Sequence, residues 1–401
     1  MTKFFASNRD QLITKLNGGI IVVSAYTAMQ RSNDTAFTFE QEANFWWLTG
    51  IELPDWWLII DGTRRKTWLA APTLSRTHEI FDGSLSPEEA KKISGVDDVI
   101  SQDDAKKMLR DIAKRHSVVY TLGEQPYAEY LDFTLNPSGR KMQEQLERMF
   151  NSVQDCRKEL AKLRAIKQPE ELTRMKKAVN LTVAAFEEVK AKLAEYSYEY
   201  EVEAEFSHYF RKNGARGHSF DPIVASGKNT CTLHYLENNS RLKKRTLLLL
   251  DIGARYEGYS TDIARTYSLG EPTKRQQEIH AAVQAAHAEI ISLLGPDLSV
   301  EQYQRDVDAI MIRTLMSVGL LKDKSDTKNY RKYFPHAISH GLGIDPHDSL
   351  GGPHFLQPNM VLTVEPGIYV PEEGIGVRIE DDILITEKGH LNLSGRLSTD
   401  L

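Results

Sequence analysis

The 401-residue sequence is poor in cysteine and has no long hydrophobic run. Its two cysteines, Cys156 and Cys231, exclude a disulfide framework and a cysteine-based zinc site. The most apolar stretches, residues 18–26 and 247–252, are far shorter than the roughly 18–20 residues that a membrane-spanning helix needs. The N-terminal segment lacks the apolar core of a signal peptide. We therefore expect a cytoplasmic protein that contacts no membrane.

Charge of one sign is also scarce, and several common motifs are missing. The chain has 50 Lys and Arg against 56 Asp and Glu, which gives a net charge of −6, and the basic residues are scattered. A dedicated nucleic-acid-binding protein usually carries a basic patch, so we expect no nucleic-acid partner. The absence of a P-loop and of a Gly-x-Ser-x-Gly elbow argues against an ATPase and a lipase-type hydrolase.

The length and the order of the predicted elements indicate two domains. The apolar fraction of 41% is ordinary for a globular protein, and a single core rarely grows past about 250–300 residues. Short apolar runs such as Ile20–Ser24, alternating with helical patterns, predict an α/β domain over residues 1–155. Residues 141–195 show a helical apolar repeat that Pro169 should interrupt. Most of the polar clusters lie in the remaining domain, residues 156–401.

Two aspartates flank a predicted hairpin in this second domain. The apolar strand 247–252 contains Asp251, Asp262 follows eleven residues later, and Gly253 and Gly258 favour a turn between them. A hairpin of this spacing would bring the two carboxylates together. A carboxylate that follows four leucines is costly to bury unless it is paired, hydrogen-bonded or bound to a metal. Taken alone, the two aspartates could bind a metal, but they could also form structural ion pairs with basic side chains or cap a turn.

Two glutamates and three histidines follow. Glu365 ends an apolar strand, and Glu380 shares one face of another predicted strand with Arg378, so these last two could simply form an ion pair. Three histidines lie in a stretch that also contains two glycines: His336, His340 and His347. A lone histidine is usually a surface or core residue, but three so close together suggest a site.

The four carboxylates would repel one another if they converged without cations. Two divalent metal ions would neutralise them, with His340 as a nitrogen ligand. Such a hard, oxygen-rich set favours Mn²⁺ and also suits Fe²⁺, Co²⁺ or Zn²⁺. Two ions about 3.5–4 Å apart can share a bridging water and convert it to a hydroxide nucleophile near neutral pH.

Five residues, in this order and context, resemble the ligands of the dinuclear metallopeptidases with the pita-bread fold: Asp251, Asp262, His340, Glu365 and Glu380. The segments HAISHGLGIDPHD, TVEPGIY and GVRIEDD resemble the proline-peptidase branch, which includes aminopeptidase P and prolidase. Residues 37–55 resemble the creatinase-like N-terminal domain of aminopeptidase P. The resemblance implies an α/β or α+β chain of two domains, a creatinase-like domain over residues 1–155 and a catalytic pita-bread domain over residues 156–401.

The resemblance also implies a role for each ligand. Asp251 would chelate one metal, and Asp262 and Glu380 would bridge both. His340 and Glu365 would complete the second metal's coordination. Glu365 would in addition pass a proton from the bridging water to the leaving group, as a general base and then a general acid.

Five further residues would contact the substrate. The segment CTLHYLENN resembles the histidine-bearing loop of the proline-peptidase branch and provides His234. The resemblance implies that His234 and His347 hold the scissile carbonyl and stabilise the tetrahedral intermediate. It places His336 and Arg378 along a pocket for the proline ring, with Tyr369 nearby.

The implied activity is hydrolysis of the bond between an N-terminal residue and a following proline, in a peptide substrate. A prolidase that cuts only Xaa-Pro dipeptides is the main alternative, and Arg378 would serve either enzyme. A metal-free creatinase or a non-catalytic binding module fits less well, because all five ligands are present. The family resemblance suggests a homodimer or tetramer. The pairs Trp46–Trp47 and Trp56–Trp57 could serve an interface or the core of the N-terminal domain.

Overall fold

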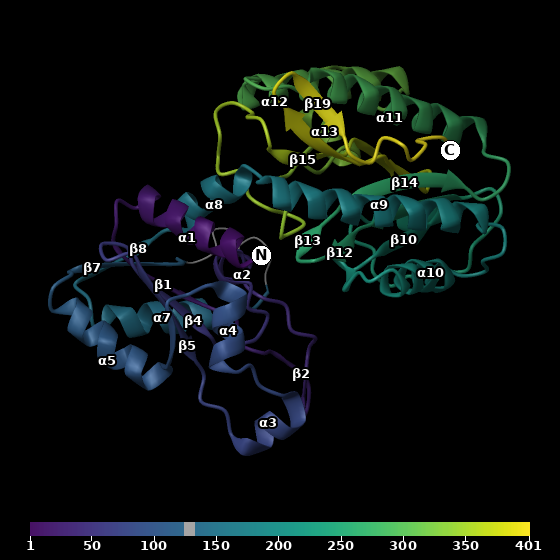
Figure 1. The fold of residues 1–401 in the computed structure, drawn as a ribbon. Coiled ribbons are helices and arrows are strands. Elements are labelled where there is room, and N and C mark those ends of the chain that lie inside the picture. The colour runs from purple at the N-terminus through teal and green to yellow at the C-terminus, as the bar shows by residue number, and fades with distance from the viewer. Residues whose placement is uncertain (124–132) are drawn as a thin grey trace. The chain divides into compact units, whose positions relative to one another are not determined.

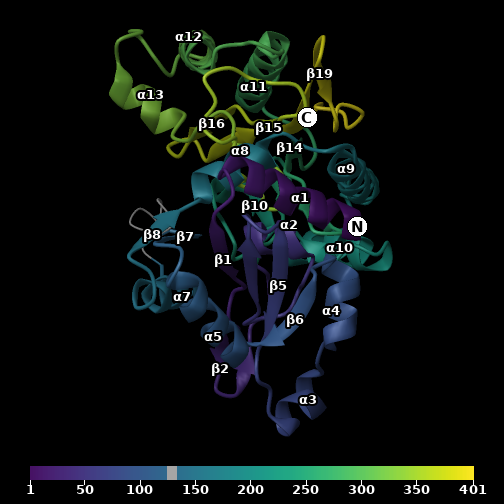
Figure 2. The ribbon, with the colours of Figure 1, turned by 60° about the vertical axis from the view of Figure 1, so that its left-hand side comes forward.

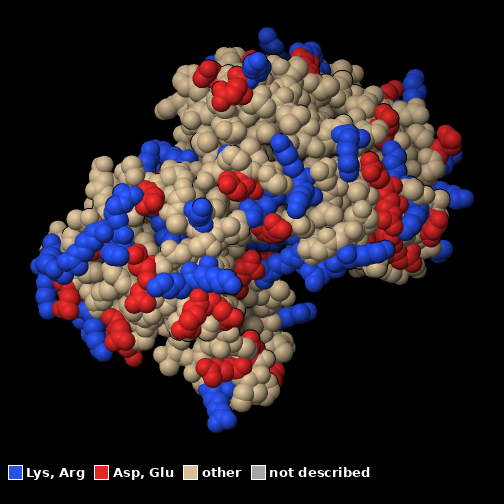
Figure 3. Space-filling view, viewed as in Figure 1, with Lys and Arg blue, Asp and Glu red and all other residues tan. Residues whose placement is uncertain are grey.

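The computed structural model describes residues 1–123 and 133–401, which divide into two compact units, Met1–Leu163 and Arg164–Leu401 (Figure 1). None of the helices within the described residues combines the length and the apolar character that crossing a bilayer requires. Lysine, arginine, aspartate and glutamate side chains are interspersed over the face drawn in Figure 3.

The first unit is built on a six-stranded mixed sheet. Its strands lie in the order β6 (Asp98–Ser101), β5 (Lys66–Ala71), β4 (Trp57–Asp61), β1 (Ile20–Ser24), β7 (Val118–Thr121) and β8 (Ser152–Asp155). Strand β4 pairs antiparallel with β1 and β5, whereas the pairs β5–β6, β1–β7 and β7–β8 are parallel. Strand β1 begins and ends at the residues that the apolar run predicts, and all five of its residues are buried.

Helices cover both faces of this sheet (Figure 2). They are α1 (Thr2–Lys15), α2 (Ala43–Thr49), α4 (Pro87–Ser94), α5 (Gln102–Ala113) and α7 (Ser138–Glu147). Helices α5 and α7 place Leu109 and Leu146 in one buried cluster with Val22 of β1. The outlying elements are helix α3 (Arg76–Asp82) and the hairpin of β2 (Gln30–Ser32) and β3 (Thr35–Ala36). Helix α8 (Arg157–Ala165) leads into the second unit.

The structure corrects the predicted helical stretch of residues 141–195 and locates the paired tryptophans. The helical pattern predicted over residues 141–195 is interrupted by β8, a short strand whose residues are half-buried or exposed and therefore show no apolar signal. Helix α9 does begin at Pro169, as predicted. Three of the four paired tryptophans, Trp46, Trp47 and Trp56, are buried in the core of this unit, and Trp57 is half-buried on β4.

The second unit contains two large hydrophobic cores, each beneath its own helices, and a smaller buried cluster that includes Leu249 and Tyr369. One core lies under α9 (Pro169–Ala191) and α10 (Glu199–Lys212), against the strands β10 (Ile223–Ser226), β11 (Leu247–Ile252), β12 (Ala254–Tyr256) and β14 (Ile263–Ser268). The other lies under α11 (Lys274–Leu293), α12 (Val300–Ser317) and α13 (Thr327–Tyr333), against β15 (Val361–Val364), β16 (Gly367–Val370), β17 (Ile375–Arg378) and β18 (Asp381–Thr386). In Figure 1, α11 and α12 lie along one edge of this unit and α10 lies along the opposite edge.

The sheets between these helices are short and antiparallel. They comprise β10–β11–β14, β15–β18–β19 with β19 at Gly389–Asn392, the pair β16–β17, and β9–β12–β13 with β9 at Gly217–His218 and β13 at Tyr259–Ser260. A 3₁₀ turn, η1 (Gly227–Cys231), follows β10. The strands predicted over residues 247–252, before Glu365 and around Arg378 correspond to β11, β15 and β17.

The predicted hairpin between Asp251 and Asp262 is present, but only one of its glycines makes the turn. Glu257 and Gly258 have φ values of 47° and 87°, as the two central residues of a type I′ hairpin turn require. Gly253 lies instead where Thr261, on the other arm of the hairpin, and Ser219 approach its backbone closely. A side chain on Gly253 would overlap the carbonyl oxygen of Thr261 and the hydroxyl of Ser219.

This close approach predicts that Gly253→Ala will lower the free energy of unfolding by about 1–3 kcal/mol, as overpacking of a core does. Gly295→Ala is the matched control, because its new Cβ would meet only Gly389 Cα at 3.7 Å. Thermal unfolding of both variants checks the prediction, which an unchanged melting temperature for Gly253→Ala would contradict.

Candidate metal centre

The five residues predicted as metal ligands come from five places in the second unit and converge. Asp251 lies in β11, Asp262 directly before β14, Glu365 directly after β15, and Glu380 between β17 and β18. His340 lies in an extended segment outside the regular elements. All five belong to the same compact unit, so their convergence is a property of that unit alone.

Backbone hydrogen bonds of the sheets explain why three of the carboxylates meet. Asp251 lies opposite Ala264 in the β11–β14 register, two residues from Asp262. The Glu380 backbone N–H donates to the carbonyl oxygen of Ala264 at 3.0 Å, on the other side of the same strand. The three carboxylates therefore lie around one residue of β14.

A second set of backbone bonds brings His340 and Glu365 together. The Glu365 N–H donates to the carbonyl oxygen of Ile338 at 3.0 Å, and the Thr363 N–H donates to that of His340 at 3.0 Å. The His340 N–H in turn donates to Thr363 Oγ1 at 3.2 Å. The segment that carries His340 thus runs alongside β15 and is fixed by Thr363.

The donor atoms form three overlapping groups, each within 4.8 Å: Asp251, Asp262 and Glu380; His340, Glu365 and Glu380; and Asp262, His340 and His347. His340 Nε2 lies 3.5 Å from Asp262 Oδ2 and 3.5 Å from Glu365 Oε1. Three buried oxygens accept no hydrogen bond from any described residue: Asp251 Oδ1, Asp262 Oδ1 and Glu380 Oε1. Unsatisfied carboxylate oxygens beside an imidazole suit a hard or borderline divalent cation, so the residues present fit the predicted metals.

Burial and mutual repulsion make these carboxylates hard to ionise together. Burial, followed by the adjacent Asp251 carboxylate, raises the pKa of Asp262 well above its usual range. Burial, then Asp262 and Glu365, does the same to the pKa of Glu380. Burial likewise raises the pKa of Glu365 to about 8, although His340 opposes the shift. The protein without metal therefore holds protons where cations would otherwise supply the positive charge.

Arg378, Tyr369 and His336 form a connected group beside Asp251. The Arg378 guanidinium donates to Asp251 Oδ2 at 2.6 and 3.1 Å and to the Tyr369 hydroxyl at 2.7 Å. The Tyr369 hydroxyl lies 2.9 Å from His336 Nε2, and His336 Nδ1 lies 3.4 Å from Glu365 Oε2. Arg378 thus forms its ion pair with Asp251 and not with Glu380, the partner that the sequence suggested. The predicted role of these residues in a proline pocket stays a prediction.

His347 and His234 lie at the exposed side of the cluster. The rings of His347 and His340 have their centroids 4.3 Å apart. Partial desolvation, with His340 and His234 nearby, lowers the pKa of His347 to about 4. Burial, with Arg378 as the next contributor, lowers the pKa of His336 to about 4 as well. Both imidazoles are therefore neutral at pH 7, and each can donate one N–H and accept at the other nitrogen.

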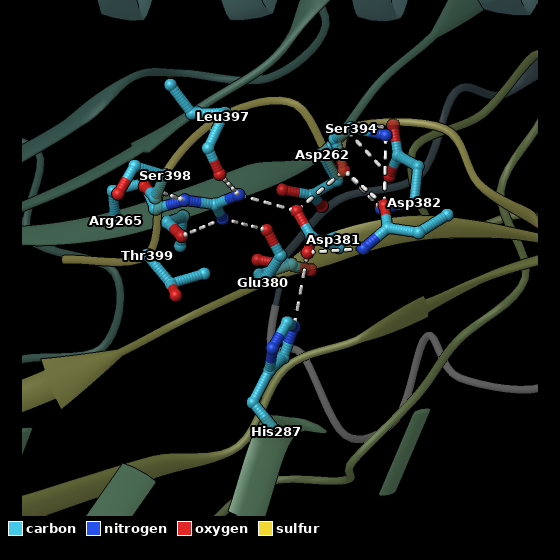
Figure 4. Close-up of polar contacts among 12 residues, drawn as sticks. Asp262, Arg265, His287, Glu380, Asp381, Asp382, Ser394, Leu397, Ser398 and Thr399 are labelled. Atoms are coloured by element: carbon cyan, nitrogen blue, oxygen red, sulfur yellow. Dashed lines mark hydrogen bonds and ion pairs between the residues drawn. The ribbon is translucent and has the colours of Figure 1, made fainter. Parts of the chain in front are cut away.

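A buried polar network, unexpected from the sequence, supports the cluster from behind (Figure 4). The Asp262 backbone N–H donates to the carboxylate of Asp382 at 3.3 Å. Arg265 donates to the carbonyl oxygen of Glu380 at 2.7 Å and to Asp381 Oδ1 at 2.7 Å. Asp381 Oδ1 and Oδ2 have three further partners: Ser394, Asn392 and His287. The run Glu380–Asp382 therefore has one carboxylate in the cluster and two behind it.

A group of buried charged side chains beside the histidine segment was likewise not predicted. Arg164, Lys167 and Asp348 are all buried, and Arg164 donates to Asp348 Oδ1 at 3.0 Å. Asp348 stands in a motif quoted for the resemblance, but 184 positions separate it from Arg164. No local pattern links residues so far apart, so only the fold reveals the pair.

The fold and the cluster of carboxylate and imidazole donors together define a metallopeptidase. Residues 173–387 match metallopeptidase family M24, and residues 5–120 match the N-terminal domain of aminopeptidase P. The chain belongs to metallopeptidase family M24. This confirms the predicted family.

Similar proteins extend over nearly the whole chain. The Xaa-Pro aminopeptidase of Escherichia coli K12 is 33% identical over 97% of this chain and 94% of its own length. The human Xaa-Pro aminopeptidase 3 is 32% identical over 93% of this chain and 78% of its own. The structure of aminopeptidase P from E. coli in its low-pH form has a TM-score of 0.87 and 31% identity, covering 100% of this chain and 96% of that one. These likenesses confirm the predicted two-domain α/β architecture with a pita-bread domain.

The raised pKa of Glu365 predicts how the stability of the metal-free protein depends on pH. Between its ordinary value of 4.5 and about 8, the folded protein keeps a proton that the unfolded chain has released. The free energy of unfolding should therefore fall as the pH rises through this window. Denaturant titrations at several pH values, with a chelator present, measure the slope.

Glu365→Gln is the matched control, because its neutral amide cannot release a proton. Its slope over the same pH window should be smaller than that of the wild type. Saturation with Mn²⁺ should also remove the loss of stability, since the cation replaces the proton. Equal slopes for the metal-free wild type and Glu365→Gln would contradict the assignment.

Proposed function

We propose that this protein is a metal-dependent aminopeptidase that hydrolyses the bond between the N-terminal residue of a peptide and a following proline. The observation that carries the proposal is the convergence of Asp262, His340, Glu365 and Glu380 with Asp251, each fixed through strand backbone. Membership of the metallopeptidase family and the likeness to Xaa-Pro aminopeptidases support it. These relatives favour the aminopeptidase over the prolidase alternative, and over a creatinase or a binding module.

A divalent metal is required for this activity, and we propose two ions, with Mn²⁺ favoured and Co²⁺, Zn²⁺ or Fe²⁺ as alternatives. A zinc-substituted E. coli aminopeptidase P in complex with product has a TM-score of 0.85 and 30% identity to this chain, covering 100% of it and 96% of that chain. Asp251 would hold one ion, Asp262 and Glu380 would bridge the pair, and His340 and Glu365 would hold the other. Bound ions would supply Lewis-acid activation of water and of the scissile carbonyl.

The protein's own side chains account for the proton transfers. Glu365 Oε1 lies 3.5 Å from His340 Nε2. With cations in the site to offset the raised pKa, Glu365 would be ionised and could accept a proton from an attacking water. It would then deliver that proton to the proline nitrogen as the C–N bond breaks. Because a bond before proline has a tertiary amide nitrogen without an N–H, a mechanism that needs no donor at that position suits this substrate.

The histidines and the Arg378 group account for binding. His347 and His234 would donate hydrogen bonds to the carbonyl oxygen as it gains negative charge, since an imidazole carries at least one N–H donor. His336, Arg378 and Tyr369 would line the pocket for the proline ring. Since Arg378 already contacts Asp251 and Tyr369, we propose that it shapes this pocket by holding them.

The domain limits, the compartment and the oligomeric state are also proposed. We propose that residues 1–155 form the creatinase-like domain and residues 156–401 the catalytic domain. The two compact units, which divide after Leu163, support this division in outline. The two cysteines are unpaired with each other, which is consistent with the cytoplasm. A homodimer or tetramer is proposed, and sedimentation of the full chain tests it.

Protein loaded with Mn²⁺ should hydrolyse a Xaa-Pro-Xaa tripeptide and release the first residue, and a chelator should abolish the reaction. The same peptide with alanine in place of proline serves as the control for specificity and should be cut much more slowly. Assays of Gly-Pro in parallel test the alternative, because cleavage of the dipeptide alone would identify a prolidase.

Glu365→Gln should lower kcat by about 10²–10⁴-fold, the usual contribution of a general acid–base group.

Glu380→Gln should abolish turnover, bind fewer than two ions per chain by metal analysis, and still fold. Its metal-free form should unfold at a higher temperature than the wild type, because folding no longer has to keep a buried carboxyl group protonated that ionises in the unfolded chain. Full activity in Glu380→Gln would exclude the bridging role.

A further inference from the structure

The loop that carries His347 is anchored by buried charges at its base. Arg164 Nη2 lies 3.0 Å from Asp345 Oδ2 and 3.0 Å from Asp348 Oδ1. Lys167 Nζ lies 3.7 Å from Asp348 Oδ2 and donates to the carbonyl oxygen of Arg164 at 2.7 Å. The side chains of Arg164, Lys167 and Asp348 are at most 5% exposed. Charges this deeply buried are stable only when they are paired, so the three residues depend on one another.

Backbone hydrogen bonds and close packing hold the loop around Asp348. The Asp348 N–H donates to the carbonyl oxygen of Gly341 at 2.8 Å, which closes the loop at its base. A side chain at Gly343 would overlap the Asp348 carboxylate. Ser260 contacts the loop from the hairpin, donating its N–H to the Gly343 carbonyl oxygen at 2.8 Å. The Asp348 carboxylate thus occupies space that the loop's glycines leave open.

His347 and His340 are held by different parts of the structure. His340 is fixed by two hydrogen bonds to Thr363 of β15, through its N–H and its carbonyl oxygen. His347 directly precedes Asp348 in the sequence, and the His347 side chain is exposed. The rings lie 4.3 Å apart, so a displacement of the loop at Asp348 would move one ring relative to the other.

We propose that Arg164, Lys167 and Asp348 are positioning residues that set His347 over the metal centre and act on turnover through His347, without contributing to metal binding. The proposal rests on the proposed function for its kinetic readout. A misplacement of about 1 Å at a reacting centre can cost about a hundredfold in rate, so a small shift of His347 would be measurable.

A double-mutant cycle with Asp348→Asn and His347→Ala tests this coupling on a Xaa-Pro-Xaa tripeptide. Asp348→Asn keeps the shape of the side chain but removes the charge that pairs with Arg164. We expect it to lower kcat about 10–100-fold, with a smaller effect on KM and no change in Mn²⁺ affinity by calorimetry. In the His347→Ala background it should have little further effect on kcat, since the residue through which it acts is absent.

The outcomes that would overturn the proposal are specific. An equal loss of kcat from Asp348→Asn in both backgrounds would show a general structural role. An unchanged kcat, or a Mn²⁺ affinity that falls with kcat, would also exclude it. Thr363→Val is the matched control, because it removes a contact to His340 and should weaken metal binding instead.

Two further measurements keep the test decisive. If Asp348→Asn does not fold, Asp345→Asn removes only the half-exposed partner of Arg164 and should give a smaller loss with the same dependence on His347. In zinc-loaded protein with labelled histidines, Asp348→Asn should shift or broaden the ring signals of His347 and leave those of His340 in place. A wild type that cleaves no Xaa-Pro peptide would overturn the proposed function, whereas unaltered His347 signals would overturn the positioning role.

Discussion

The repulsion among buried carboxylates is the constraint on which the rest of this structure depends. Asp251, Asp262 and Glu380 are at most 7% exposed, and Glu365 lies beside them. Buried anions this close are unfavourable without a cation or a proton. The raised pKa values of Asp262, Glu365 and Glu380 express that cost in the protein without metal. The close burial of these carboxylates therefore lowers the stability of the protein without metal.

The fold meets this constraint with backbone hydrogen bonds, which hold the carboxylates in place whatever their charge. Strand β14 aligns Asp251 and Glu380 on its two sides, and β15 aligns Glu365 with the segment of His340. Arginines then contact the periphery of the cluster. Arg378 binds Asp251 directly, and Arg265 binds the backbone of Glu380 together with Asp381. Each arginine is buried and has several acceptors, so neither charge is left isolated.

The two halves of the histidine segment are held by different parts of the structure. His340 faces the carboxylates and is tied to β15, a rigid strand with a fully buried core face. His347 faces outward on a loop whose base is secured by Arg164 and Asp348. The two histidines of this short stretch of chain, His340 and His347, therefore have separate supports.

The sequence by itself determined the residue types at the site and most of the strands that carry them. Apolar runs followed by acidic residues predicted β11 and β15, and a glycine between Asp251 and Asp262 predicted the turn at Gly258, because side-chain period and turn chemistry are local properties. Only the tertiary structure decided which charges pair. The partner of Arg378 is Asp251, 127 positions away, and that of Arg164 is Asp348, 184 positions away. Charged side chains carry no local signal of their partner, since packing of distant strands sets which of them meet.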